Sequence, residues 1–161
     1  MPPTIRLATA ADAATIHGFI VALAVYEREP DAVEVTPAVL AAQMASAPPP
    51  FECLLAEADG AAVGCALFFQ TYSTWRGRIG LHLEDLFVLP EHRRHGVGTA
   101  LLARLAGVAC DRGAARLEWA VLDWNQPAIE FYRTVGAAPL GDWTTWRMTD
   151  EALRTLGGGG A

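Results

Sequence analysis

The chain has 161 residues, the length of one domain, and its 52% hydrophobic content excludes an intrinsically disordered protein. Its 18 acidic and 12 basic residues give a net charge of −6, which argues against a nucleic-acid-binding surface. No apolar run is long enough to cross a membrane, and the first residues lack the apolar core of a signal peptide. We therefore expect a cytoplasmic protein with one domain at residues 1–156 and a flexible Gly-rich tail at residues 157–161.

The first third of the chain predicts one short strand and two helices. A strand at residues 5–7 precedes Thr9-Ala-Ala-Asp12, whose pattern resembles a capping box and predicts a helix from Thr9 to about Tyr26. Apolar residues follow at helical spacing: Ile16, Phe19, Ile20 and Leu23. Thr36-Pro37 predicts the start of a second helix, which ends before the prolines at 48–50.

Three antiparallel strands are predicted next. Residues 53–58 and 61–72 are apolar runs joined by Asp59-Gly60, a pair typical of a hairpin turn. Residues 81–88 form a third apolar run, which contains two adjacent acids, Glu84 and Asp85. A glycine-containing loop and an amphipathic helix at residues 97–110 follow, and this order of elements indicates the α+β class.

The last third predicts two strands and one helix. Residues 116–122 form a strand parallel to residues 81–88, because a helix connects the two. Asn125 and Pro127 predict the start of a helix that runs to Gly136, and residues 143–148 form the last strand. Together the elements predict a mixed central sheet of about six to seven strands flanked by helices.

The cysteines and histidines show no metal-site pattern. Cys53, Cys65 and Cys110 lie in apolar stretches without pair spacing, as buried thiols in a reducing compartment do. The four histidines also lack metal-ligand spacing, so we expect no metal site.

The loop Arg93-x-x-Gly96-x-Gly98 stands between a predicted strand and a predicted helix. Glycines there let backbone N–H groups approach a phosphate, and the helix dipole adds partial positive charge. A nucleoside-triphosphate loop is excluded because Gly98 is followed by Thr99 and no lysine. A dinucleotide fingerprint lacks its third glycine at Leu101. The alternative is a plain turn before a helix.

The stretch L-E-D-L-F-V-L-P-E-H-R-R-H-G-V-G-T resembles the signature of the GNAT acetyltransferases, whose Arg/Gln-x-x-Gly-x-Gly/Ala loop holds the pyrophosphate of coenzyme A. More narrowly, the chain resembles the spermidine/spermine and thialysine N-acetyltransferase family. Five blocks in the same order carry this resemblance: residues 22–27, 71–77, 83–88, 93–99 and 120–132.

The resemblance implies the GNAT fold and an activity. The enzyme would transfer the acetyl group of acetyl-CoA to a primary amine of a small molecule, by direct attack in a ternary complex. Thialysine-like amino acids, diamines and polyamines are the substrate classes that it implies. A homodimer is also implied.

Acetyl transfer to an amine poses two proton problems. A primary alkylamine has a pKa near 10.4 and must lose a proton before it attacks, and the leaving thiolate must gain one. By resemblance, Glu84 accepts the first proton and Tyr132 donates the second. Adjacent acids on a strand point to opposite faces unless a bulge intervenes, so Asp85 faces away from Glu84 in a regular strand. Each residue has an alternative role. Glu84 would be a structural partner of His82 or Arg93, and Tyr132 would be a core aromatic residue.

The resemblance also implies the residues that contact the cofactor. The backbone of Leu86, Phe87 and Val88 would pair with the pantetheine arm. The pyrophosphate loop and the next helix start supply the rest: Arg94, His95, Gly96, Val97, Gly98 and Thr99, and then Asn125, Gln126, Pro127 and Ala128. Arg93 has two interpretations, as a phosphate partner or as plain surface charge.

The substrate site is implied in the same way. Its residues are Tyr26, Glu27, Trp75, Glu84, Asp85, Glu118, Trp119 and Ala120. The acids of residues 27–34 form either an acidic lip that attracts an amine or a solvated connector. Trp143 and Trp146 either wall the cleft or belong to the core. In the polyamine-specific branch, an acid stands two residues before the tryptophan of the second block. This chain has Ser73 there. The loss of that acid favours a shorter amine or an amino acid with a side-chain amine as the substrate.

Two other functions remain open from the sequence. One is a non-catalytic acyl-CoA-binding sensor with the same fold. The other is an acetyltransferase that acts on a protein amine, since acidic loops suit basic peptides as well as diamines.

Overall fold

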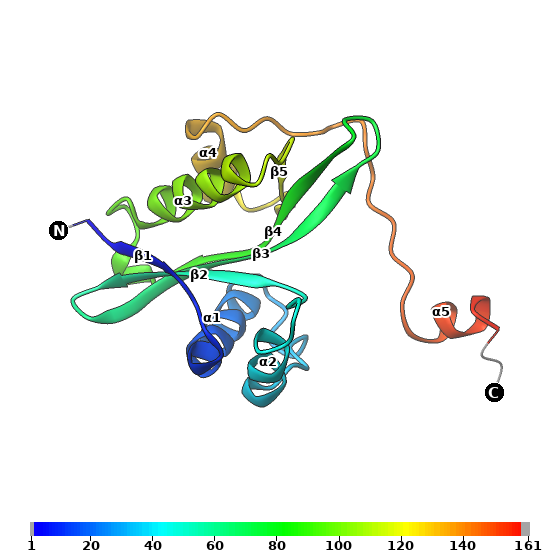
Figure 1. Cartoon of the computed structure of the whole chain (residues 1–161), viewed down its shortest axis with the longest axis horizontal. Coiled ribbons are helices and arrows are strands. Elements are labelled where there is room, and N and C mark those ends of the chain that lie inside the picture. Colours follow the sequence, from blue (N-terminus) through cyan, green and yellow to red (C-terminus); the bar gives the residue numbers. More distant parts are fainter. Residues whose placement is uncertain (1, 159–161) are drawn as a thin grey trace. The chain divides into compact units, whose positions relative to one another are not determined.

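The computed structural model describes residues 2–158, which form two compact units that meet in the sequence between Trp124 and Asn125 (Figure 1). No helix within the described range is long and apolar enough to cross a membrane.

The first unit contains a five-stranded mixed sheet in the order β1-β2-β3-β4-β5. Its strands are β1 (Thr4–Leu7), β2 (Glu52–Ala58), β3 (Ala61–Ser73), β4 (Arg78–Val88) and β5 (Leu117–Glu118). The first four are antiparallel, and β5 runs parallel to β4, as the helical connection predicts. The α+β class is confirmed, but the predicted count of six to seven strands is wrong.

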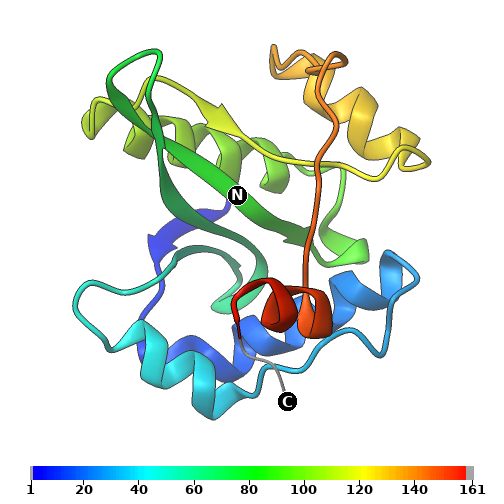
Figure 2. The ribbon, with the colours of Figure 1, turned by 90° about the vertical axis from the view of Figure 1, so that its right-hand side faces the viewer.

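Helices cover both faces of this sheet (Figures 1 and 2). One face carries α1 (Ala13–Tyr26) and α2 (Pro37–Met44), and the other carries α3 (Val97–Asp111). Ile16 and Phe19 of α1 are buried in one cluster with Leu67 and Phe87 of the sheet. The expected pattern of apolar residues in the first helix therefore forms the core on that side.

The N-terminal cap of the first helix is confirmed. Thr9 and Asp12 form the capping box, and a short 3-10 turn, η1 (Ala10–Asp12), leads into α1. Asp12 also accepts a hydrogen bond from Arg6 at 2.8 Å, and Arg6 donates to Glu57 at 2.8 Å. Arg6 thus ties β1 to the helix start and to β2.

The start of the second helix and one hairpin turn were also predicted correctly. The Thr36 hydroxyl accepts a hydrogen bond from the Val39 backbone at 3.3 Å and caps α2, which ends at Met44. Asp59 and Gly60 have φ of 51° and 78°, which is the left-handed backbone that a tight hairpin needs.

Of the cysteines, Cys53 and Cys65 are buried as expected, whereas Cys110 is exposed.

The parallel strand is much shorter than the predicted residues 116–122. Only Leu117 and Glu118 pair with β4, opposite Leu81 and His82. Beyond His82, no described strand of the first unit pairs with the β5 side of β4. This edge of β4 is therefore open along residues 83–88.

The second unit contains α4 (Gln126–Thr134) and α5 (Asp150–Leu156). The Asn125 side chain accepts a hydrogen bond from the Ala128 backbone at 3.4 Å, which confirms the predicted cap. The predicted strand at residues 143–148 is wrong, because the described part of this unit contains no strand for it to pair with. Of the predicted tail, Gly157 caps α5, and residues 159–161 lie outside the described residues.

Candidate functional site

β4 carries one extra residue at Glu84. Asp85 pairs with Leu67 of β3, and Leu83 pairs with the next residue, Phe68, so Glu84 has no partner in the ladder. A β-bulge of this kind interrupts the regular alternation of side chains along the strand. The expectation that the two acids point to opposite faces holds only for a strand without a bulge, and this strand has one.

The bulge gathers His82, Glu84 and Asp85 on one face of the sheet. Asp85 shares the face of Leu67, which lies in the core cluster with α1. His82 pairs with Phe69, which is two residues beyond Leu67 and so shares its face, and the two rings lie 5.0 Å apart. His82 Nε2 lies 3.3 Å from a carboxylate oxygen of Glu84, so Glu84 reaches the same face.

Glu27, at the C-terminal end of α1, adds a third carboxylate, and we call Glu27, Glu84 and Asp85 the acid cluster. Burial, followed by the charges of Glu84 and Glu27, raises the pKa of Asp85 to about 6. Burial and the charge of Glu84 also raise the pKa of Glu27. Like charges act in this way only at short range. The acid cluster is therefore suited to attract an organic cation and to accept its proton.

Aromatic rings and two arginines lie beside the acid cluster. The rings of Tyr26 and Trp124 are 6.0 Å apart, and the Arg28 guanidinium lies 4.0 Å from the centre of the Trp124 ring. Arg93 lies 5.3 Å from the centre of the Tyr26 ring and donates a hydrogen bond to the Val88 carbonyl oxygen at 2.9 Å. Arg93 is exposed, and this hydrogen bond uses only its Nε, so its two predicted roles, phosphate partner and surface charge, stay predictions.

The glycine loop leads from β4 through η2 (Pro90–His92) into α3. Arg94 and Gly96 have φ of 64° and 78°, and Gly96 is the N-cap of α3. Ala100 donates to the Gly96 carbonyl oxygen at 2.9 Å, and the backbone N–H groups of the first helical turn have no acceptor inside the helix. A Cβ at Gly96 would meet no atom within 4 Å, so this side of the loop is open. The loop fits an anionic group such as a pyrophosphate.

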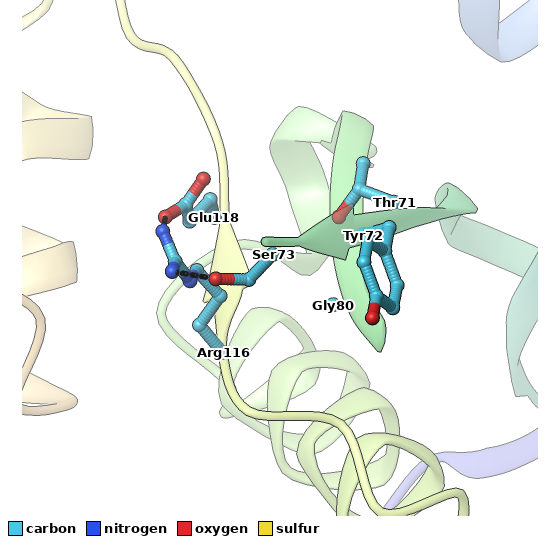
Figure 3. A pocket seen from close by; sticks show the side chains of 6 residues that line it. All are labelled: Thr71, Tyr72, Ser73, Gly80, Arg116 and Glu118. Atoms are coloured by element: carbon cyan, nitrogen blue, oxygen red, sulfur yellow. Dashed lines mark hydrogen bonds and ion pairs between the residues drawn. The ribbon is translucent and has the colours of Figure 1, made fainter. Parts of the chain in front are cut away.

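A pocket of about 110 Å³ lies where β3, β4 and β5 come together (Figure 3). Its lining residues are Thr71, Tyr72, Ser73, Gly80, Arg116 and Glu118. The buried Ser73 hydroxyl accepts hydrogen bonds from the Arg116 guanidinium and from the Arg76 backbone, the latter at 3.2 Å. Arg116 also donates to Glu118 at 3.2 Å. The pocket therefore contains one cation and one anion.

The second unit holds the remaining predicted site residues. Asn125 is buried and caps α4, whose first turn contains Gln126, Pro127 and Ala128. Tyr132 is half-buried, and its ring lies 5.5 Å from that of Phe131. Its role as a proton donor stays a prediction.

The structure brings together some predicted residues and adds others. One cluster contains Glu27, Glu84 and Asp85. Glu118 lies in the pocket of Ser73 and Arg116. Trp75, in contrast, is 87% exposed in the β3–β4 loop. Half-buried Trp119 and exposed Ala120 directly follow β5. The contact between His82 and Glu84, one of the alternatives predicted for Glu84, is present. Sequence reasoning missed two residues that the geometry places at these sites: Arg116 and Trp124. The spacing of Arg116 and Glu118, two residues apart on one strand, was the available signal for that pair.

Comparison with known proteins agrees with this geometry. Residues 19–137 match the family described as "Acetyltransferase (GNAT) family". The chain belongs to this family, whose members use acetyl-CoA as the acetyl donor.

Individual relatives are more specific. The chain is 39% identical to a thialysine N-epsilon-acetyltransferase of Sus scrofa over 165 aligned positions, which cover 96% of each chain. It is 38% identical to an L-ornithine N5-acetyltransferase of Arabidopsis thaliana over 98 positions, 61% of this chain and 43% of the relative. Among solved structures, an integron cassette protein of V. cholerae superposes with a TM-score of 0.81 at 22% identity and covers 98% of each chain, which shows the fold.

Proposed function

We propose that this protein transfers the acetyl group of acetyl-CoA to a primary amine of a small molecule, with thialysine-like amino acids among its substrates. The observation that carries the proposal is the bulge at Glu84, which places two adjacent carboxylates on one face of β4 beside an open strand edge. Membership of the GNAT family and the names of the relatives support the same activity.

Two features of the first unit would hold the acetyl donor. The open edge of β4 offers the backbone groups of Leu86, Phe87 and Val88 to an extended chain such as the pantetheine arm. The N–H groups from Arg94 to Thr99 would hold the pyrophosphate at the N-terminus of α3, where the helix dipole favours negative charge. When bound, acetyl-CoA supplies an activated thioester.

The acid cluster would bind and deprotonate the amine. An alkylammonium ion is attracted by three neighbouring carboxylates, and the Tyr26 and Trp124 rings lie near the same place. Glu84 is the proposed proton acceptor, and its side chain is 56% exposed and so accessible to a substrate. Asp85 would share the proton, because its pKa of about 6 lies close to the pH at which the enzyme would work.

Tyr132 of α4 is the proposed proton donor to the leaving thiolate, and Asn125 to Ala128 are proposed to lie against the cofactor. A homodimer is part of the same proposal. These assignments rest on the family resemblance of the residues that surround them in the sequence.

The test is a thiol-release assay with acetyl-CoA and a panel of amines: thialysine, lysine, ornithine, short diamines, spermidine, spermine and a basic peptide. We expect turnover on a small primary amine and its loss in the Glu84→Gln/Asp85→Asn double variant. Turnover on the peptide alone would show that the protein acetylates protein amines. Tight binding of acetyl-CoA without turnover on any amine would make the protein a sensor.

A further inference from the structure

Ser73 and Arg116 present hydrogen-bond donors at the pocket. A serine hydroxyl has two acceptor sites and one donor, and both acceptor sites of Ser73 are used, by the Arg116 guanidinium and the Arg76 backbone. Its own hydrogen is therefore directed to a third group. The Arg116 side chain is 41% exposed and carries five N–H donors, of which two are accounted for by Ser73 and Glu118. Convergent hydroxyl and guanidinium donors are suited to a carboxylate.

A negative charge lies directly beside these donors. The carboxylate of Glu118, whose side chain is 44% exposed, lies 3.2 Å from Arg116. Figure 3 shows Ser73, Arg116 and Glu118 joined in one hydrogen-bonded chain at the edge of the pocket. An α-amino acid carries a carboxylate and an ammonium group on one carbon, so its two charges match this pair. A diamine offers only ammonium groups, which Arg116 repels.

The pocket and the acid cluster occupy the same face of the sheet. Ser73, Thr71 and Phe69 alternate along β3 and so share one face, which is also the face of His82, the partner of Phe69. Glu118 lies beside His82 in the parallel ladder, and His82 contacts Glu84 at 3.3 Å.

The distance between the two sites suits a short substrate. Gly80, at the floor of the pocket, and Glu84 are four residues apart on β4, about 13 Å at the usual strand rise. The side chains of Arg116 and Glu84 both extend toward the position of His82, because Arg116 contacts Glu118 and Glu84 contacts His82. The gap between the two side chains is thus shorter than the backbone distance, and the proposal requires one extended amino-acid side chain to span it.

We propose that the pocket of Ser73, Arg116 and Glu118 binds the α-carboxylate and α-ammonium groups of a diamino acid, while the side-chain amine of that substrate lies at the acid cluster. This inference rests on the function proposed above and narrows its substrate to one class. The Arg116 guanidinium and the Ser73 hydroxyl bind the carboxylate, and Glu118 binds the α-ammonium group. Gly80 keeps the pocket open, because a Cβ there would lie 2.7 Å from the Thr71 hydroxyl oxygen and 3.4 Å from the Arg116 side chain.

The experiment compares amino acids with their decarboxylated counterparts: lysine with cadaverine, and ornithine with putrescine. Each pair differs only in the carboxylate. For the wild type we expect a higher kcat/KM on the amino acid of each pair. Arg116→Gln should raise KM for the amino acids roughly 10- to 100-fold with little change in kcat, and should leave kcat/KM for the diamines unchanged or higher.

Two further variants keep the test decisive. Ser73→Asp should pair with Arg116, remove the donor hydroxyl and produce the same selective loss for amino acids. Arg76→Gln is the matched control, since Arg76 is exposed, contacts Ser73 through its backbone and carries the same charge. It should leave both members of each pair unchanged.

The outcomes separate the inference from the function. A wild type that prefers the diamines, or an Arg116→Gln loss that is equal for both members of a pair, would overturn the inference and leave the acetyltransferase function standing. A wild type that acetylates no amine would overturn the function and the inference together. Thermal unfolding of each variant identifies any loss that comes from misfolding.

Discussion

The imidazole Nε2 of His82 lies 3.3 Å from a carboxylate oxygen of Glu84. This contact holds Glu84 on the face of the sheet that Asp85 and its ladder partner Leu67 share. The two adjacent acids can share this face because Glu84 has no partner in the ladder. Two adjacent carboxylates therefore act at one place, in different surroundings: Glu84 is exposed beside an imidazole, and Asp85 is half-buried.

The first prediction concerns the pH dependence of catalysis. The pKa of Asp85 is about 6, so the wild-type kcat/KM should rise as the pH passes through about 6, where Asp85 ionises and can share a proton. Asp85→Asn should lower kcat/KM roughly 100-fold and remove this inflection. A pH profile from 4.5 to 8.5 measures both. An unchanged inflection in the variant would assign it to a different group.

The second prediction concerns stability at the same residue. The folded pKa of Asp85 is raised from 3.8 to about 6, so the folded state binds more protons than the unfolded state between these values. Stability should therefore fall as the pH rises from about 4 to about 6. Asp85→Asn removes this loss and should be more stable than the wild type by about 2 kcal/mol above pH 6. Urea unfolding of both proteins at pH 4 and pH 7 tests the difference, which should vanish at the lower pH.

The third prediction concerns Arg6 and Asp12, which join β1 to the start of the first helix. Hydrogen bonds from Arg6 and from the Thr9 backbone lower the pKa of Asp12 to about 2, so the stabilisation is present above about pH 4 and is lost as the pH falls toward 2. Asp12→Asn should cost about 2 kcal/mol at pH 7. Asp142→Asn, at an exposed position, is the control and should change the unfolding free energy little.

The fourth prediction concerns the glycine loop. Gly96 and Gly113 both have positive φ, 78° and 69°, and a Cβ meets nothing within 4 Å at either, so alanine imposes a similar backbone strain of about 1 kcal/mol. Only Gly96 precedes the first turn of α3. Gly96→Ala should raise KM for acetyl-CoA roughly 5-fold, and Gly113→Ala should not. Equal effects of the two substitutions on this KM would show that the loop does not bind the cofactor.

The fifth prediction concerns Tyr132. If its hydroxyl protonates the leaving thiolate, Tyr132→Phe should lower turnover roughly 100-fold and change acetyl-CoA affinity little. Single-turnover kinetics and calorimetric titration measure the two quantities. Unchanged turnover would show that the proton comes from another donor.

Local chemistry made part of the fold predictable. The capping box at Thr9 and Asp12 and the left-handed turn at Asp59 and Gly60 depend on neighbouring residues only, and both are present in the structure. Residues 143–148 show the limit of such reasoning. Tryptophan and threonine are both common in strands and fill most of this segment, but a strand forms only when another strand pairs with it.

The site was predictable to a smaller degree. Glu84 and Asp85 stand out in an apolar run, but the bulge that unites them is a property of two strands and depends on which residue of β3 lies opposite each acid. The Arg116 pocket likewise depends on the contact between Ser73 and a residue 43 positions later in the chain. No local pattern contains that contact.

The most direct test of the central claim is mass-spectrometric analysis of the reaction of the wild type with acetyl-CoA and thialysine. The account predicts a product acetylated once, on the side-chain nitrogen, formed with equimolar release of coenzyme A and absent with the Glu84→Gln/Asp85→Asn variant. Release of coenzyme A by hydrolysis without an acetylated amine, or acetylation that persists at full rate in the double variant, would contradict it.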